Sequence, residues 1–136
     1  MGATPHIVLF VEDNLAERQA WSNALKGCAP HYTILEASTA ELGLALCQNQ
    51  KVDCVILDPD MPLEVGFKLL LDLIPDPTRP TIAVVVLTRL PYAYLHDVLL
   101  RVGAHAILVK QYASPDELAQ VVHDAIATVA AVRPRN

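Results

Sequence analysis

Hydrophobic positions along the chain fall into short apolar runs that alternate with amphipathic stretches. Five runs, rich in aliphatic and β-branched residues, predict strands over 6–11, 32–35, 52–57, 82–87 and 104–109. Apolar residues at helical spacing predict helices over 15–25, from 38 or 39 to 49, and over 66–74, 92–102 and 115–130. Gly27 is expected to end the first helix. This alternation indicates an α/β fold, with right-handed crossovers and a parallel sheet covered by helices on both faces.

The composition indicates one folded domain. The chain has 136 residues, of which 53% are hydrophobic and 18% are charged, so it can build a core. We expect the domain over 6–130, an N-terminal extension over 1–5 and a frayed tail over 131–136. The mean hydropathy of +0.34 is high, but charge-free runs such as 80–88 are far shorter than the roughly 18 residues of a membrane span. Strands buried on both faces explain the hydropathy, and no membrane insertion is expected.

Charge and cysteine content narrow the partners and the compartment. Ten Lys and Arg residues against fifteen Asp and Glu residues give a net charge of −5, so direct nucleic-acid binding is not expected. Cys28, Cys47 and Cys54 are odd in number, widely spaced and without a CxxC pair, which is typical of reduced thiols in a cytoplasm. No basic segment followed by an apolar one begins the sequence, so we predict a cytoplasmic protein.

Polar residues that can carry chemistry stand at the ends of four predicted strands. They are Glu12 and Asp13 after the first strand, Asp58 after the third, Thr88 at the end of the fourth and Lys110 after the fifth. Ligands of open parallel sheets bind beyond the carboxyl ends of the strands, where these side chains should meet. Clustered carboxylates repel one another unless a cation intervenes, and Mg²⁺ suits such oxygen ligands. A lysine and a hydroxyl suit phosphoryl oxygens, and an aspartate can itself accept a phosphoryl group.

In this arrangement residues 6–127 resemble the receiver domain of two-component response regulators. The resemblance rests on Val-Glu-Asp-Asn at 11–14, Val-Ile-Leu-Asp-Pro-Asp-Met-Pro at 55–62, Gly66, Thr88, Gly-Ala at 103–104 and Lys110. It implies a flavodoxin-like fold of five strands in the order 2-1-3-4-5. It also implies a domain that takes a phosphoryl group from a histidine and signals by a conformational switch.

The resemblance assigns a role to each of these positions. Asp58 would be the phosphoacceptor and a Mg²⁺ ligand, and Thr88 and Lys110 would hold the phosphoryl oxygens. Asp13 would bind Mg²⁺ directly, with Glu12 in support and Asp60 contributing its backbone carbonyl. The implied partners are a sensor histidine kinase or histidine phosphotransfer protein as donor, and a downstream protein or fused domain as receiver of the signal. The face of helix 4, strand 5 and helix 5 would make partner contacts and is a candidate homodimer face.

Four positions depart from the family pattern. Gln111 follows Lys110 where proline is usual, as in receivers associated with hybrid sensor proteins. A cis non-proline bond costs about 3–4 kcal/mol, so this bond is expected to be trans or else a strained exception. Ile107 replaces an aromatic residue that swings inward on activation, and Leu63 replaces a glycine. Arg89 replaces a small residue, and it is expected either to shield the phosphoryl group or to pair with an acid at the rim.

Two other functions are compatible with parts of the sequence. A pseudo-receiver, which signals by protein contact without phosphorylation, is suggested by Ile107 and Gln111. The Asp-Pro-Asp run at 58–60 is similar to the motif of haloacid-dehalogenase-type phosphatases, but that family carries the motif on its first strand. Uptake of phosphate from acetyl phosphate separates a receiver from a pseudo-receiver, and turnover of a generic phosphate ester identifies a phosphatase.

Overall fold

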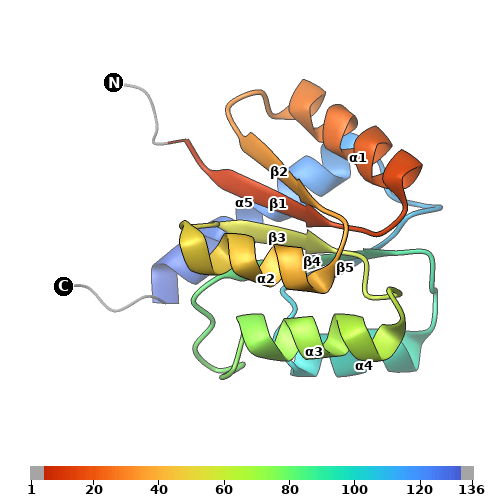
Figure 1. Ribbon diagram of the computed structural model, residues 1–136, viewed down its shortest axis with the longest axis vertical. Helices are drawn as coiled ribbons and strands as arrows, with labels where there is room; N and C mark the ends of the chain where they lie inside the picture. The colour runs from red at the N-terminus through yellow and green to blue at the C-terminus, as the bar shows by residue number, and fades with distance from the viewer. Residues whose placement is uncertain (1–4, 133–136) are drawn as a thin grey trace.

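The computed structural model describes residues 5–132 as strands and helices that alternate along the chain (Figure 1). The strands are β1 (Ile7–Val11), β2 (Thr33–Ala37), β3 (Cys54–Leu57), β4 (Ala83–Thr88) and β5 (Ala106–Val109). The helices are α1 (Leu15–Cys28), α2 (Ala40–Asn49), α3 (Leu63–Leu73), α4 (Ala93–Arg101) and α5 (Pro115–Val132). All strand pairs are parallel and the order is β2-β1-β3-β4-β5, which confirms the predicted fold class and strand order.

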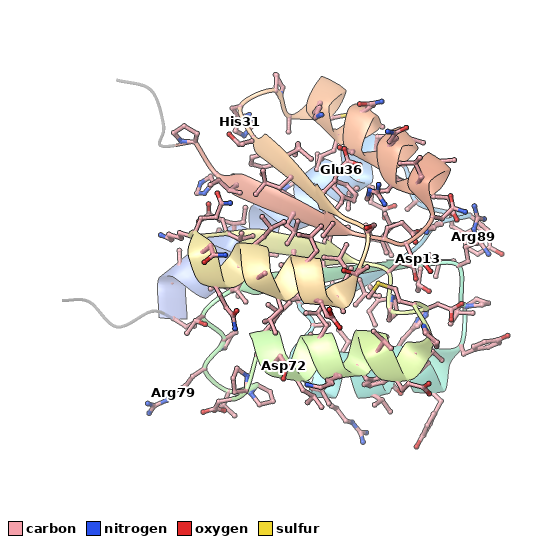
Figure 2. The ribbon with its side chains drawn as sticks, in the orientation of Figure 1. Asp13, His31, Glu36, Asp72, Arg79 and Arg89 are labelled. Carbon is pink, nitrogen blue, oxygen red and sulfur yellow. The ribbon has the colours of Figure 1, made fainter. Side chains whose placement is uncertain are left out.

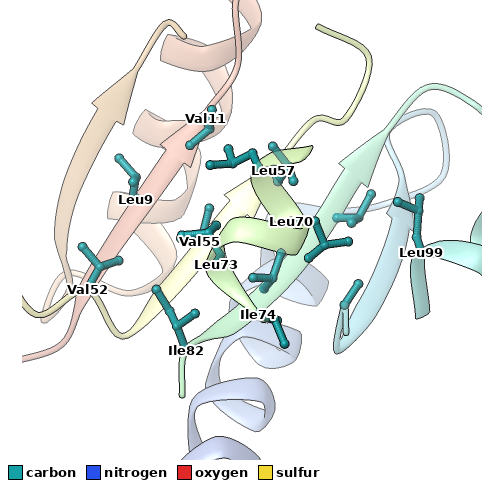
Figure 3. Close-up of a cluster of buried hydrophobic side chains, with 14 of the residues drawn as sticks. Leu9, Val11, Val52, Val55, Leu57, Leu70, Leu73, Ile74, Ile82 and Leu99 are labelled. Atoms are coloured by element: carbon teal, nitrogen blue, oxygen red, sulfur yellow. The ribbon is translucent and has the colours of Figure 1, made fainter. Parts of the chain in front are cut away.

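Alternate strand residues build a separate hydrophobic core on each face of the sheet. In β1, Val8 and Phe10 pack in the core that α1 and α5 cover, whereas Leu9 and Val11 face α2, α3 and α4. Figure 3 shows the second core, in which Leu70 and Leu73 of α3 lie over the strand residues. Burial on both faces explains why β1, β3 and β4 are continuous apolar runs, and it fixes their register.

The end of α1 and the start of α3 differ from the prediction. The first helix was expected to end at Gly27, but α1 continues through this residue to Cys28. A glycine in a helix costs only about 1 kcal/mol relative to alanine, which burial of Leu25 and Ala29 outweighs. Helix α3 starts at Leu63, three residues before the predicted start, because Pro62 serves as its N-cap residue rather than as part of a longer loop.

The last helix ends at Val132, two residues beyond the predicted end near Ala130. The predicted tail therefore begins with helical residues, and its remainder, 133–136, lies outside the described residues. Residues 1–4 of the predicted N-terminal extension also lie outside them. Among the described residues, no helix is both long and apolar enough to cross a membrane.

Gly66 allows the loop after β3 to pack directly against α3. A Cβ atom at this position would lie 2.1 Å from the carbonyl oxygen of Pro59, a backbone atom that cannot move aside cheaply. We expect Gly66→Ala to lower the free energy of unfolding by about 1–3 kcal/mol in urea titrations, because overpacking forces the backbone to shift. Gly27→Ala is the matched control, since its added Cβ would have no atom within 4 Å beyond its chain neighbours and the backbone of its own helix, and it should stabilise the protein by up to about 1 kcal/mol. Equal stability of the two variants would contradict this packing.

Candidate functional site

The carboxyl ends of the strands bring the predicted side chains to one edge of the sheet. Glu12 and Asp13 follow β1, Asp58 follows β3, Thr88 is the last residue of β4, and Lys110 follows β5. Figure 2 shows Asp13 at this edge, on the same side of the molecule as Arg89. The ends meet because β1, β3, β4 and β5 are consecutive parallel neighbours in the sheet.

Lys110 lies at the centre of the site. Its ammonium donates hydrogen bonds to Asp58 Oδ2 at 2.8 Å and to Glu12 Oε1 at 2.5 Å, and the Lys110 side chain is 4% exposed. Burial alone would lower the pKa of the Lys110 amine, but the hydrogen bonds with Asp58 and Glu12 outweigh burial and raise this pKa. Lys110 is therefore a fixed cation beside both carboxylates.

The two carboxylates differ in their surroundings. Glu12 is buried, and burial raises its pKa to about 7 against the lowering effect of its hydrogen bond with Lys110. Its second oxygen accepts a hydrogen bond from the backbone N–H of Asn14 at 3.2 Å. Asp58 is half-buried, and its Oδ1 accepts the backbone N–H of Asp60 at 3.0 Å. The Asp58 carboxylate is thus oriented by donors on both oxygens while its side chain stays partly open to solvent.

Thr88 and the acids at the rim complete the edge. The Thr88 side chain is buried, and its hydroxyl oxygen accepts the backbone N–H of Leu90 at 3.1 Å, which leaves the hydroxyl hydrogen free to be donated. Asp13 and Asp60 are exposed. Within residues 5–132, no three Asp, Glu, His or Cys side chains are arranged to hold a metal ion, and the Lys110 ammonium lies between Glu12 and Asp58.

Sequence reasoning missed Glu17, which also contacts Lys110. Its Oε1 accepts the Lys110 ammonium at 3.2 Å, and this oxygen also accepts Arg89 Nη2 at 2.7 Å. Burial alone would raise the pKa of Glu17, but its hydrogen bonds from Arg89 and Lys110 lower this pKa overall. A signal was present in the sequence: Asn14 caps α1 by accepting the backbone N–H of Glu17, which places an acid in the first helical turn after Asp13.

The loops that depart from the family pattern are tied to one another. Arg89 forms an ion pair with Glu17 in this structure, which is pairing with an acid as the sequence allowed. The Gln111 side chain donates a hydrogen bond to the backbone carbonyl of Arg89 at 3.0 Å, which joins the loop after β5 to the loop after β4. The only cis peptide bond among the described residues is Met61–Pro62, and the Lys110–Gln111 bond is trans as expected. Ile107 is half-buried against the core under α3 and α4.

Comparison with protein families matches residues 8–123 to the response regulator receiver domain. The match spans most of the chain, and the chain therefore belongs to this family. Receiver domains act in two-component signal transduction as signalling phosphoacceptors rather than as classical enzymes, which sets aside the phosphatase alternative. They typically bind Mg²⁺, interact with histidine kinases and can be fused to output domains.

Several solved structures have the same fold. A receiver domain from Clostridium thermocellum is 22% identical, with a TM-score of 0.81 over 94% of this chain and 99% of that one. The chemotaxis protein CheY4 of Vibrio cholerae is 24% identical, with a TM-score of 0.76 over 90% and 99%. NtrX from Brucella abortus is 21% identical, with a TM-score of 0.79 over 94% of this chain but 28% of that one. A search among curated proteins found no match.

Proposed function

We propose that Asp58 accepts a phosphoryl group and that the resulting change in conformation carries the signal. The observation that supports this proposal most strongly is the pairing of Asp58 with a buried cation: Asp58 Oδ2 lies 2.8 Å from the ammonium of Lys110. The Asp58 side chain is 12% exposed, so a donor can reach an aspartate that is already oriented. A fixed cation beside the attacking oxygen stabilises the charge of the incoming phosphoryl oxygens.

The transfer follows from the groups around Asp58. A carboxylate oxygen of Asp58 forms a bond to phosphorus while the bond from phosphorus to the donor histidine nitrogen breaks, and the electron pair stays on that nitrogen. Lys110 is held where it can bind a phosphoryl oxygen, and the free hydroxyl hydrogen of Thr88 can donate to another. Both groups act by position and charge, because phosphoryl transfer requires little other help from the protein.

The donor set at this edge fits Mg²⁺, which prefers oxygen ligands. We propose that the carboxylates of Asp13 and Asp58 and the backbone carbonyl of Asp60 hold the ion, with Glu12 in support. When bound, Mg²⁺ neutralises the negative charge of the acids and of the phosphoryl oxygens. Glu12 is buried and Asp58 is half-buried, and both acids share a single cation, Lys110, with Glu17. Negative charge therefore exceeds the positive charge that Lys110 supplies, which supports a place for a divalent cation.

Addition of Mg²⁺ is expected to raise the thermal midpoint. A ligand that binds only the folded state stabilises it by about 1.4 kcal/mol at ten times its Kd. Asp13→Asn should weaken this rise, because it removes one proposed ligand, and thermal melts in EDTA and in millimolar Mg²⁺ measure the effect. Asp72→Asn, which removes an acid that pairs with Lys68 on α3, should respond like the wild type. A midpoint that does not change with Mg²⁺ contradicts the proposed site.

Partners and compartment follow from the family and the exposed face. We propose a sensor histidine kinase or a histidine phosphotransfer protein as donor, and, because Gln111 replaces the usual proline, association with hybrid sensor proteins. Tyr92, Tyr94 and Tyr112 are 61%, 82% and 83% exposed around α4 and β5, which supports this face as the contact with a downstream partner, a fused domain or a second copy of the chain. Receiver domains are usually cytoplasmic, and we propose a cytoplasmic location here.

Intact-protein mass spectrometry after incubation with acetyl phosphate and Mg²⁺ tests the proposed function. We expect the wild type to gain the mass of one phosphoryl group, and this gain should be lost on hydrolysis of the acyl phosphate. EDTA should suppress the gain. A protein that is folded, binds Mg²⁺ and gains no phosphoryl group is a pseudo-receiver, which would signal by contact alone.

A further inference from the structure

Glu17 joins two cations at the edge of the pocket that contains the proposed acceptor. Its Oε1 accepts Arg89 Nε at 2.9 Å, Arg89 Nη2 at 2.7 Å and Lys110 Nζ at 3.2 Å. Glu17, Asp58 and Lys110 line the same pocket. Glu17 comes from the first turn of α1 and Arg89 from the loop after β4, so a single carboxylate connects segments that are far apart in the sequence.

Glu17 and Asp58 share Lys110, and they are therefore competitors for positive charge. The Lys110 ammonium contacts both carboxylates, at 3.2 Å and 2.8 Å. Arg18, the next residue in α1, does not take part in this competition, because its guanidinium is bound to Glu36 and to the backbone carbonyl of Glu12. Among these groups, Arg89 and Lys110 are the cations that Glu17 holds beside the acceptor.

The Arg89 side chain is able to change partners. It is 59% exposed, whereas the Glu17 side chain is 25% exposed. The Arg89 backbone is fixed independently, because Gln111 donates to its carbonyl oxygen. The long guanidinium can therefore leave Glu17 by rotation of side-chain bonds alone, without movement of the loop.

We propose that Glu17 is a positioning residue that binds the Arg89 guanidinium in the unphosphorylated protein, and that a phosphoryl group on Asp58 competes with Glu17 for Arg89. A phosphoryl group carries more negative charge than a carboxylate and offers three acceptor oxygens, and the planar guanidinium binds such groups bidentately. Arg89 then covers the phosphoryl oxygens. This inference rests on the proposed phosphorylation of Asp58.

The proposal has a consequence for hydrolysis of the acyl phosphate. In hydrolysis, a water oxygen forms a bond to phosphorus, the bond from phosphorus to the Asp58 oxygen breaks with its electron pair returning to the carboxylate, and the water loses a proton to solvent. Arg89 bound to the phosphoryl oxygens stabilises the ground state and hinders the approach of water. Only contacts that strengthen in the transition state accelerate a reaction, so Arg89 prolongs the phosphorylated state. Glu17 shortens this state because it competes with the phosphoryl group for the Arg89 guanidinium.

The half-life of the phosphorylated protein, followed by intact mass after removal of acetyl phosphate, tests this proposal. We expect Arg89→Ala to shorten the half-life about 3- to 10-fold and Glu17→Gln to lengthen it about 3-fold, effects that correspond to small changes in activation free energy. In the Arg89→Ala background, Glu17→Gln should lose most of its effect, because its effect acts through Arg89. Arg89→Lys, which keeps the charge but not the bidentate geometry, should lie between the wild type and Arg89→Ala.

Glu41→Gln is the matched control, since it removes an acid from the first turn of another helix, α2, and it should leave the half-life unchanged. A merely structural role of Glu17 would not depend on Arg89 in this way. The inference is overturned if Glu17→Gln matches the wild type or shortens the half-life, or if its lengthening persists fully without Arg89. Absence of phosphate uptake by the wild type would instead overturn the proposed function, and this inference with it.

Discussion

Asp58→Asn is expected to take up no phosphoryl group from acetyl phosphate and Mg²⁺, whereas the wild type takes up one. The amide that replaces the carboxylate has no anionic oxygen to attack phosphorus, and it cannot form an acyl phosphate. The shape of the side chain is nearly the same, so the Asp58 Oδ1 contact with the backbone of Asp60 can be kept by the amide oxygen. Intact-protein mass measures the loss of uptake, and a urea titration verifies that the variant is folded, because its amide nitrogen replaces the oxygen that accepts the Lys110 ammonium.

Asp60→Asn provides the matched control for this variant. It makes the same chemical change two residues away, at an exposed side chain for which only the backbone carbonyl has a proposed role. We expect it to take up phosphate like the wild type. Uptake by Asp58→Asn at the wild-type level would show that another residue accepts the phosphoryl group.

Lys110→Met is expected to lower the free energy of unfolding by about 3–5 kcal/mol in EDTA, the range found when one partner of a buried ion pair is removed. The Lys110 side chain is 4% exposed, and its ammonium is shared by Glu12, Asp58 and Glu17. Methionine fills a similar volume but leaves the Glu12 and Asp58 carboxylates without a cation, whereas Glu17 keeps its ion pair with Arg89. Added Mg²⁺ should restore part of the loss, because it supplies positive charge to the same acids. Urea titrations with and without Mg²⁺ measure both effects.

Lys68→Met is a suitable control for the loss of a lysine. Lys68 pairs with Asp72 on the surface of α3, and its side chain is 76% exposed. Exposed pairs of this kind contribute about 0.3–0.5 kcal/mol, so the variant should be almost as stable as the wild type. If Lys110→Met were as stable as the wild type in EDTA, the ion pairs of Lys110 with the three carboxylates would not stabilise the site.

The sequence predicted the edge of the sheet better than the details of its rim. A polar residue that directly follows a buried parallel strand must lie at the carboxyl edge, so Glu12, Asp58 and Lys110 were located from strand ends alone. Glu17 was not, although the start of its helix at residue 15 was predicted, because its contacts with Lys110 and Arg89 join segments that are far apart in the sequence. Asn14 as the cap of this helix places Glu17 in the first turn, but it does not indicate which distant side chains Glu17 contacts.

Tertiary contacts also decided features that local sequence rules left open. Gly27 does not end α1, because packing of the last turn against α5 and the sheet favours continuation of the helix. Arg89 was expected to shield a phosphoryl group or to pair with an acid at the rim; the structure pairs it with Glu17, and shielding of a phosphoryl group stays a proposal. Such choices depend on side chains that are distant in sequence, which no local pattern encodes.

Chemical identification of the phosphorylated residue tests the central claim most directly. Borohydride reduces an aspartyl phosphate to homoserine, and peptide mass spectrometry then locates that homoserine in the chain. After incubation of the wild type with acetyl phosphate and Mg²⁺, we predict homoserine at position 58 and at no other aspartate. Homoserine at position 13 or 60, phosphate retained on a histidine, or the absence of any modified residue would contradict the assignment of Asp58 as the phosphoacceptor.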